Sequence, residues 1–319
     1  MPPQVVSLGD LVADLIVPIA RLPVRPYEHQ LARDMLIEAG GTGNFLTLAA
    51  RLGLRAMALG VAGQDFFGEQ VLAALTNEGV DLTHVIVPPH SRTTVSIVLV
   101  DDAAQHVFVW MNGRGAQQPF DPAWHAIVER ADAVFTTGYA LQPTSTFAPS
   151  AVKICLGIAH ARKIPVFFDL GPAAAQAEQA DVDAVVERTT VFLATDEEIA
   201  AWTGIDDPRR AAGELLAQGP TMVIVKLGGR GCLIVTAEQH TLADTFPVAV
   251  RNTAGAGDAF SAACVYGYLQ GYSIEQIGIL ANAVGAASVA TLGTGTRLPR
   301  KQEITELLSR HGHTFFNDQ

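Results

Sequence analysis

The stretch NTAGAGDAF, residues 252–260, places an acid beside a turn that has almost no side chains. Gly255, Ala256 and Gly257 precede Asp258, and the residues from there on, DAFSAACVYGYLQG, are nearly all apolar or small, which predicts a buried helix. The segment before the turn, DTFPVAV, alternates like a strand. Because the first N–H groups of a helix lack intrahelical partners and lie at its positive end, the turn predicts an anion site. An acid next to such a site indicates a general base.

Asp258 also has a simpler interpretation as a helix cap, because Asp is common at helix N-termini. The glycine pattern alone is weak evidence as well, since GxG occurs in many turns. A second glycine-rich helix start, EAGGTGNFLTLAARLG, and the acid in SLGDLVADLI favour the base. There Asn44 opens a predicted helix and Asp14 ends the first predicted strand, and both side chains suit the hydroxyls of a sugar.

Short apolar runs alternate with stretches of helical period along most of the chain. The runs are VVSLG, RAMALG, AVFTTG, PVFFDL, TVFLAT and TMVIVKLG, and helical segments such as NFLTLAARLG and AVKICLGIAHARK lie among the stretches between them. This alternation predicts parallel strands that are buried on both faces and joined by helices, which is an α/β fold. Ligands of such sheets gather beyond the carboxyl ends of the strands.

Two pairs of β-like segments break this rhythm because no long helix separates their members. DLIVPIARLP pairs with QLARDMLIEA, and TTVSIVLVDD pairs with HVFVWMNG through the hairpin-like connection DAAQ. We expect a small β lid over the substrate end, built from about residues 12–38 and 92–114, within one domain of residues 1–319. Antiparallel edge strands of the main sheet are the alternative. The exposed edges of such a lid would allow a homodimer through the lid.

Composition and charge exclude several classes of protein. The net charge of -11 argues against a general nucleic-acid binder, which needs a basic face. The three cysteines lie far apart, so neither a disulfide framework nor a CxxC metal site is indicated, and we expect them to be reduced. The start, MPPQVVSLGDLVADLIVP, has no basic n-region and carries two acids, so it resembles neither a signal peptide nor a membrane anchor. These features predict a cytoplasmic protein with no nucleic-acid or membrane partner.

From end to end the chain resembles the ribokinase-like (PfkB) carbohydrate kinases. NTAGAGDAF matches the C-terminal signature of that family, and further segments follow in family order: GDLVAD, AGGTGN with AARLG, GQDFFG, FFDLGP, TDEEIAAWTG, VKLGGRG and ANAVGAAS. The resemblance implies a three-layer α-β-α fold with a largely parallel central sheet and a small β-sheet lid.

The resemblance also implies an ATP-dependent phosphotransferase that acts on a hydroxyl of a small sugar. Asp258 would be the general base, and the amides of Gly255, Ala256 and Gly257 would hold the negative charge that develops in phosphoryl transfer. Glu198 would organise Mg²⁺ and its waters. The implied substrate-binding residues are Asp14, Gly40, Gly41, Gly43 and Asn44, and the implied nucleotide-binding residues are Lys226, Gly228, Gly231, Asn282 near the adenine, and Asp169.

Several residues depart from the family pattern. Thr195 replaces the asparagine of the Asn-x-x-Glu segment, and Asn252 and Ala254 replace the Asp and Thr common in the signature, which argues against the monovalent-cation site of ribokinases. Gly41 stands where ribokinases carry lysine, and Tyr139 lies near the place of a glutamate. These departures point away from ribose and leave fructose, a keto-deoxy sugar acid or a nucleoside ribose open. A kinase of a nucleoside or sugar phosphate, or a non-catalytic sugar or nucleotide sensor, is the alternative function.

Other motifs add little. The chain has no GxxxxGK[ST] loop, no protein-kinase HRD motif and no HExxH spacing. Five arginines lie in or beside the predicted lid, and we expect most of them to be solvated, although two that converged on the pocket could hold a substrate phosphate or carboxylate. These are Arg21, Arg25, Arg33, Arg92 and Arg114.

Overall fold

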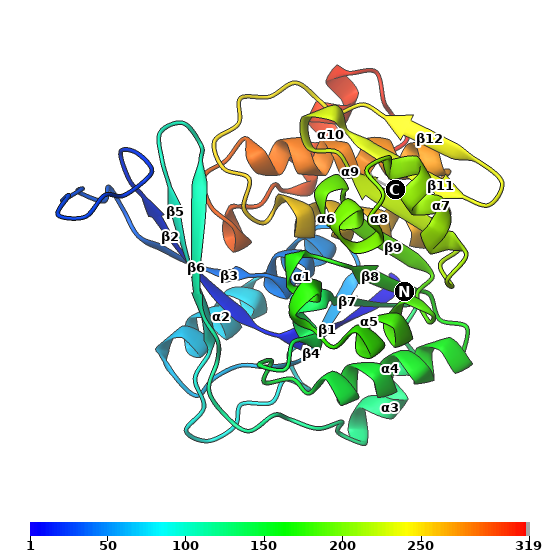
Figure 1. Ribbon diagram of the computed structural model, residues 1–319, viewed down its shortest axis with the longest axis horizontal. Helices are drawn as coiled ribbons and strands as arrows, with labels where there is room; N and C mark the ends of the chain where they lie inside the picture. The colour runs from blue at the N-terminus through cyan, green and yellow to red at the C-terminus, as the bar shows by residue number, and fades with distance from the viewer. Residues whose placement is uncertain (317–319) are drawn as a thin grey trace.

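The computed structural model describes residues 1–316 and has three layers, with helices on both faces of a central sheet (Figure 1). In this part of the chain the central sheet, sheet A, has eight strands in the order β12-β11-β10-β9-β8-β7-β1-β4. Neighbours are parallel from β4 across to β10, and β11 and β12 are antiparallel at one edge. The predicted three-layer fold is confirmed. Its strands are β1 Gln4–Asp10, β4 Arg55–Val61, β7 Ala133–Thr137, β8 Val166–Asp169, β9 Val191–Thr195, β10 Met222–Lys226, β11 Cys232–Thr236 and β12 His240–Ala243.

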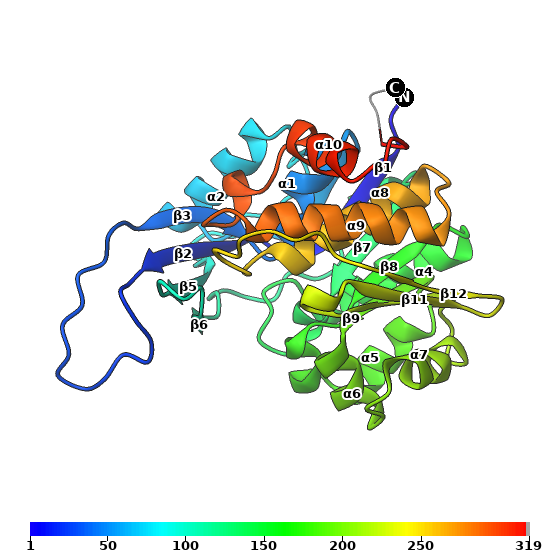
Figure 2. The same cartoon turned by 90° about the horizontal axis from the view of Figure 1, so that it is seen from above.

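Two groups of helices cover the two faces of sheet A (Figures 1 and 2). Phe167 of β8 packs into the core on one face, and Phe168 packs into the core on the other. Because successive side chains of a strand point to opposite faces, a strand covered on both sides is apolar throughout. One group is α1 Thr42–Leu52, α2 Phe66–Asn77, α8 Ala256–Leu269, α9 Ile274–Val289 and α10 Lys301–Arg310; the other is α3 Ala123–Val128, α4 Pro149–Ala161, α5 Gln179–Val186, α6 Asp196–Thr203 and α7 Pro208–Leu216.

A second sheet, sheet B, stands beside the main body at the left of Figure 1. Its strands have the order β3-β2-β5-β6 within the described residues. β2 pairs with β5 in parallel, and the two outer pairs are antiparallel. Because these strands bond to one another and form a sheet of their own, the alternative that they extend the main sheet is wrong. The strands are β2 Val12–Pro18, β3 Leu36–Gly40, β5 Thr94–Val100 and β6 His106–Met111.

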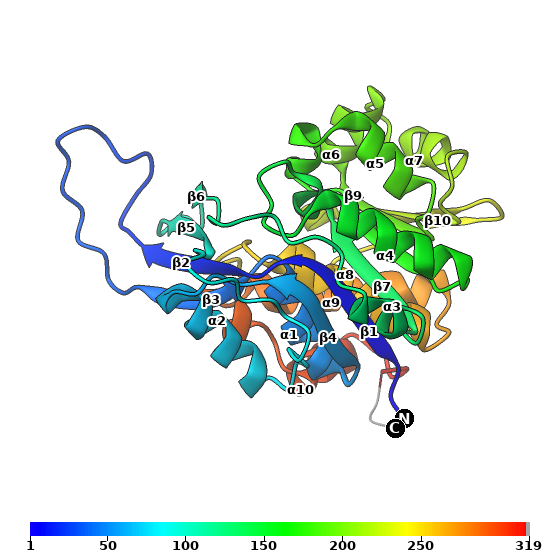
Figure 3. The same ribbon diagram turned by 90° about the horizontal axis from the view of Figure 1, so that it is seen from below.

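Three predictions about strand limits are wrong in detail. Only the last four residues of the segment QLARDMLIEA lie in a strand, β3 Leu36–Gly40, and the rest belongs to a long loop that projects between β2 and β3 (Figures 2 and 3). Asp14 is the third residue of β2 and does not end the first strand, because β1 already ends at Asp10. DTFPVAV follows β12, which ends at Ala243, and has no regular structure. Pro247 in it lacks the N–H that a strand ladder needs.

Two further features are the state of the cysteines and the length of the apolar helices. Cys155, Cys232 and Cys264 are free and buried, which agrees with the absence of a disulfide framework. Across residues 1–316, no helix combines the length and the apolar character that crossing a membrane requires.

Candidate active site

Strand ends of sheet A bring several of the predicted residues to one edge. β8 ends at Asp169, β9 at Thr195 and β10 at Lys226. These strands are parallel neighbours, so their carboxyl ends meet at the same edge of the sheet. Because ligands of α/β folds bind beyond this edge, the topology itself locates a candidate site.

The start of α8 forms the bare turn that the sequence predicts. Its N-cap is Gly255, with φ 74°, and no side chain caps the helix. A Cβ at Gly255 would lie 3.1 Å from both Asn44 Nδ2 and Thr294 Cγ2, so both the backbone conformation and the available space require glycine. The N–H of Ala256 already donates to Thr253 O at 3.3 Å, whereas a helix start leaves its other first amides without intrahelical partners.

Asp258 lies in the first turn of α8 but does not cap the helix, so the cap interpretation is wrong. Its Oδ2 accepts a hydrogen bond from Asn44 Nδ2 at 3.0 Å. Burial raises the pKa of Asp258 to about 7, with the hydrogen bond from Asn44 opposing this effect and the charge of Asp169 adding to it. A carboxylate that titrates near neutral pH suits a general base.

Lys226 points from the end of β10 toward the start of α8. Its Nζ lies 2.5 Å from Asp169 Oδ2 and 3.4 Å from Gly257 O. Ser261 Oγ, one turn further along α8, donates to Asp169 Oδ2 at 2.7 Å. Burial disfavours the ammonium, but the charge and hydrogen bond of Asp169 outweigh burial and raise the pKa of Lys226. The site therefore contains a positive charge next to the predicted anion turn.

Glu198 lies in the first turn of α6 and closes a capping box. Its Oε2 accepts from Thr195 N at 2.9 Å, and Thr195 Oγ1 accepts from Glu198 N at 3.1 Å. Thr195 therefore performs the capping role that the asparagine of the family segment could also supply. Burial and then the charge of Asp169 raise the pKa of Glu198, which is consistent with a carboxylate facing the same edge.

The predicted sugar-binding acid Asp14 is buried between sheet B and the main body. Its carboxylate packs over Gly40 of the neighbouring strand, where a Cβ would lie 2.2 Å from Asp14 Cγ. Asp14 Oδ2 accepts from Thr294 Oγ1 at 3.0 Å. Burial raises the pKa of Asp14 to about 7, and the charge of Glu38 adds to the effect. The position of the Asp14 carboxylate therefore leaves no room for a side chain at Gly40.

Asn44 is held at both ends of its amide. Nδ2 donates to Asp258, and Oδ1 accepts from Gly295 N at 2.7 Å. Gly41 is the N-cap of α1, with φ 52°, and a Cβ at Gly43 would lie 2.8 Å from Ala39 Cβ. The glycines of this helix start therefore allow close packing of α1 on β3 as well as any approach of a ligand.

The predicted nucleotide residues on β10–β11 and α9 form a connected region. Gly228 opens the short 3₁₀ turn Gly228–Arg230, and a Cβ at Gly231 would lie 2.0 Å from Ala243 O. Asn282 is buried, and its Nδ2 donates to Ala243 O at 2.8 Å and to Asp244 O at 3.2 Å. The donor group of Asn282 thus ties α9 to the end of β12.

Sheet B contacts the turn that precedes α8. Ala254 packs against Ile16, Val98 and Val100 of the sheet. Thr253 Oγ1 lies 3.1 Å from Nδ1 of His106, the first residue of β6. The small sheet therefore lies next to the predicted anion turn.

The arginines near sheet B do not gather as a group on the candidate site. Arg33 pairs with Asp102 at 2.6 Å, and Arg21 forms an ion pair with Glu28 of its own loop. The backbones of Arg92 and Arg114 bond to each other, and both residues are exposed. Arg25 is also exposed.

A comparison with protein families identifies the chain. The model for the pfkB family of carbohydrate kinases matches residues 2–301. The chain belongs to the pfkB family. It is therefore a phosphotransferase with an alcohol group as acceptor and a sugar kinase in the general sense.

Curated relatives of this pfkB-family chain carry out several sugar-kinase reactions. A 2-dehydro-3-deoxygluconokinase of Thermoproteus tenax is 29% identical over 276 residues, which cover 85% of this chain and 85% of the relative. A ribokinase of Bacillus subtilis is 27% identical over 308 residues, covering 95% of this chain and 98% of the relative.

Solved structures share the fold at lower identity. A ribokinase of Arabidopsis thaliana, complexed with ribose and ATP, has a TM-score of 0.82 at 23% identity and covers 97% of this chain and 99% of its own. A candidate ribokinase II of Escherichia coli, in complex with ATP and Mg²⁺, has a TM-score of 0.83 at 22% identity, with 97% and 100% covered.

The pfkB-family site contains residues that the sequence analysis missed. Thr294 and Gly295 supply donors to Asp14 and Asn44, and Glu38 holds Thr296 of the same loop. The run GTGTR, residues 293–297, was the available signal, since its glycines alternate with hydroxyl groups.

Tyr139 lies among the acids of the site. Tyr139 is half exposed, and partial burial raises its pKa to about 12, with the charges of nearby acids acting in the same direction: Asp258, Glu198, Asp169 and Asp14. The tyrosine that departs from the ribokinase pattern therefore belongs to this site.

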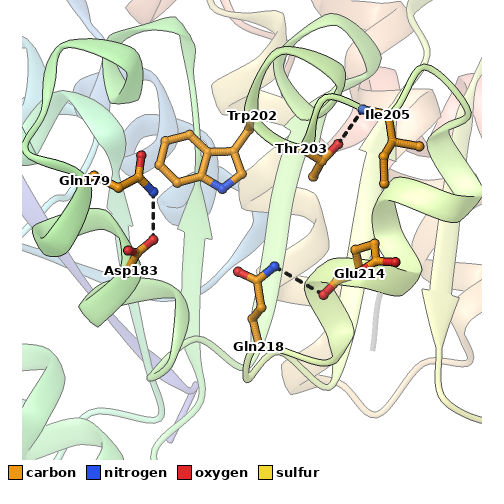
Figure 4. A pocket seen from close by; sticks show the side chains of 7 residues that line it. All are labelled: Gln179, Asp183, Trp202, Thr203, Ile205, Glu214 and Gln218. Atoms are coloured by element: carbon orange, nitrogen blue, oxygen red, sulfur yellow. Dashed lines mark hydrogen bonds between the residues drawn. The ribbon is translucent and has the colours of Figure 1, made fainter.

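A separate hollow of about 300 Å³ lies between α5, α6 and α7 (Figure 4). None of the predicted site residues lines it. Its lining is Gln179, Asp183, Trp202, Thr203, Ile205, Glu214 and Gln218.

Proposed function

We propose that this pfkB-family enzyme transfers the γ-phosphoryl group of ATP to a hydroxyl of a small sugar, with Asp258 as the general base. One observation carries the proposal. A partly buried carboxylate whose pKa is raised to about 7 lies in the first turn of a helix whose N-cap is a bare glycine, and an amide donor fixes its orientation. A base beside an anion site matches the requirements of phosphoryl transfer to an alcohol.

The residues have distinct roles in this proposal. Asp258 accepts the proton of the attacking hydroxyl, and the free amides at the start of α8 stabilise charge on the transferred group. Lys226 adds a positive charge at the same turn, because its Nζ lies 3.4 Å from Gly257 O. ATP bound with Mg²⁺ supplies the phosphoryl group. Asn44 keeps the base oriented while the sugar is bound.

The acidic residues at the edge of sheet A fit a hydrated Mg²⁺. In residues 1–316 no group of three or more His, Cys, Asp or Glu could hold a metal ion unaided. Mg²⁺ typically keeps several waters and takes only one or two carboxylates beside substrate phosphates. Asp169 and Glu198 are carboxylates that interact electrostatically at this edge, so we assign them this role.

We further propose that the enzyme needs no monovalent cation. Asn252 is buried, its Nδ2 donates to Gly293 O at 3.2 Å, and its Oδ1 accepts from Ala254 N at 3.2 Å. An amide used in this way lacks the negative charge that the carboxylate of a ribokinase signature would provide.

The charges around Asp14 favour an uncharged sugar over a sugar acid or a sugar phosphate. The charge of Glu38 helps to raise the pKa of Asp14, and the charge of Asp14 helps to raise the pKa of Asp258, so three acids share this region. Arg21 and Arg33 are paired with other acids, so the cations that face these three acids are Arg297 at Glu38 and Lys226 at Asp258.

The decisive experiment is a coupled assay of ADP release with Mg-ATP over a panel of fructose, 2-keto-3-deoxygluconate, ribose, sugar phosphates and nucleosides. We expect turnover of a neutral sugar, unchanged when the bulky cation tetramethylammonium replaces both K⁺ and Na⁺. Sugar binding by calorimetry without ADP release would establish the non-catalytic sensor instead. Preferred turnover of the sugar acid would overturn the assignment of a neutral substrate.

Sheet B acts as a lid and as a dimer contact in this proposal. Residues 107–111 of β6 are 42–55% exposed although all are apolar, and β6 is an edge strand. A second copy of the chain can cover this strand. Analytical ultracentrifugation should show a dimer that Val109→Lys dissociates, whereas Leu242→Lys on the edge strand of sheet A leaves it intact. A monomeric wild type would refute the contact.

A further inference from the structure

Glu38 of β3 holds the loop of residues 293–297 in place. Its Oε2 accepts from Thr296 N at 2.8 Å, and both carboxylate oxygens lie 2.7 Å from Thr296 Oγ1. Glu38 is only 6% exposed, and Arg297 Nε lies 3.7 Å from its Oε1. A Cβ at Gly295 would lie 2.8 Å from Glu38 Oε2, so the loop passes directly against this carboxylate.

The loop held by Glu38 presents a donor to Asn44. Gly295 N–H requires an acceptor, and Asn44 Oδ1 provides it at 2.7 Å. An amide side chain has its acceptor and its donors on opposite sides, so fixing the oxygen also fixes the NH₂ group. The NH₂ group then faces Asp258 Oδ2, 3.0 Å away. Glu38 is thus connected to Asp258 through Thr296, Gly295 and Asn44.

We propose that Glu38 is a positioning residue for the general base: it holds the 293–297 loop so that Gly295 locks the Asn44 amide with its donor toward Asp258. The proposal rests on the proposed function of Asp258. Glu38 itself needs no contact with the sugar or the nucleotide. Its effect is to keep one hydrogen bond on the base, and that bond favours the ionised form.

Several charged groups surround Asp258 and Glu38, and a test must separate their effects from those of the hydrogen bonds. Asp258 is faced by Asp169, Lys226 and Asp14 as well as Asn44. The charge of Glu38 acts on Asp14. Arg51 Nη2 also bonds the loop, at Thr296 O with 3.0 Å, so loss of Glu38 loosens the loop without freeing it completely.

The test uses the full chain with Glu38→Ala and Glu38→Gln. Glutamine can still accept from Thr296 N–H and donate to the threonine hydroxyl, so it keeps the position without the charge. Asp65→Asn is the matched control, because Asp65 also accepts from a threonine amide and hydroxyl, at Thr93, but lies at the start of α2. The readouts are the pH profile of kcat and the ¹³C titration of the Asp258 carboxyl, which needs no turnover.

For Glu38→Ala we expect the acidic limb of kcat and the carboxyl titration to move upward by on the order of one pH unit, because one hydrogen bond to the ionised base is loosened. KM for ATP should stay unchanged. Glu38→Gln and Asp65→Asn should follow the wild type. The upward movement in Glu38→Ala together with rescue by Glu38→Gln supports the proposal.

Other outcomes overturn it. An unmoved limb and titration in Glu38→Ala would show that Glu38 does not act on the base, and a Gln variant that behaves like Ala would show that only its charge matters. If Glu38→Ala does not fold, Thr296→Val provides the same test by removing one of the bonds to Glu38, with the same direction expected. Failure of the wild type to release ADP contradicts the proposed function. In that case the titration of the Asp258 carboxyl still shows whether Glu38 acts on Asp258.

Discussion

The two glycine-rich helix starts, at α1 and α8, have the same local construction but different third residues. Each has a glycine N-cap with positive φ, 52° at Gly41 and 74° at Gly255, and neither has a side-chain cap. The third helical residue is Asn44 in α1 and Asp258 in α8, and the two side chains bond to each other. The comparison shows that one start provides a neutral donor and the other the acid that this donor orients.

Replacing Asp258, the acid at the start of α8, should have the largest effect on activity. Asp258→Asn leaves an amide at both starts and removes the proton acceptor, so we expect kcat to fall by on the order of 10² or more while ATP binding and the fold are kept. Steady-state kinetics, calorimetry with ATP and circular dichroism provide the measurements. A variant that retains most of its kcat would refute the base assignment.

Removing the donor of the α1 start should have a smaller, pH-dependent effect. Asn44→Ala deletes the hydrogen bond that lowers the pKa of Asp258, so this pKa rises further above about 7. Because the base acts when ionised, kcat at pH 7 should fall by about tenfold and partly recover by pH 9. The kcat profile from pH 5.5 to 9.5 measures this. An equal loss at every pH would contradict the orienting role and indicate lost sugar contacts alone.

Two glycine-to-alanine variants separate the effect of a crowded Cβ at the start of α8 from the effect of a positive φ. Gly255→Ala places a Cβ 3.1 Å from Asn44 Nδ2, whereas Gly271→Ala, at nearly the same φ of 70°, meets nothing within 4 Å. We expect both variants to lose about 1 kcal/mol of unfolding free energy from the left-handed conformation, but only Gly255→Ala to lose several-fold in kcat. Denaturant titrations and kinetics check this. Equal kcat losses would contradict the importance of the Asn44 contact.

The smallest effect concerns stability. Burial raises the pKa of Asp258 from the ordinary 3.8 of an Asp side chain to about 7 in the folded protein, so its stabilising contribution is complete below about pH 4 and is lost as the pH rises through 7. Asp258→Asn should therefore raise the Tm at pH 8 by about 2 °C or more, and by less at pH 5. Thermal melts measure this, with exposed Asp206→Asn as the control. A lower Tm of Asp258→Asn at pH 8 would contradict the burial cost.

The fold could be predicted from the sequence to a large extent because its signals are local. Apolar runs such as residues 222–226, separated by helical stretches, identify parallel strands, and the segments at 94–100 and 106–111 identify sheet B. The limits of strands were harder. Whether the chain at Asp10 and Leu11 stays in one sheet or passes into the next depends on neighbouring strands, so Asp14 was assigned to the wrong strand.

By itself the sequence determined that a bare turn precedes an acid at a helix start, and that the chain belongs among carbohydrate kinases, because glycine conformations, helix starts and family signatures depend on residues close together. Only the tertiary structure decided that Asn44 meets Asp258, 214 positions away, and that Glu38 reaches Thr296, 258 positions away. These contacts follow from the order of strands and the packing of α1 beside α8, which no local spacing encodes. The chemistry of the acid was therefore readable in the sequence, while its orientation and its pKa came from the folded surroundings.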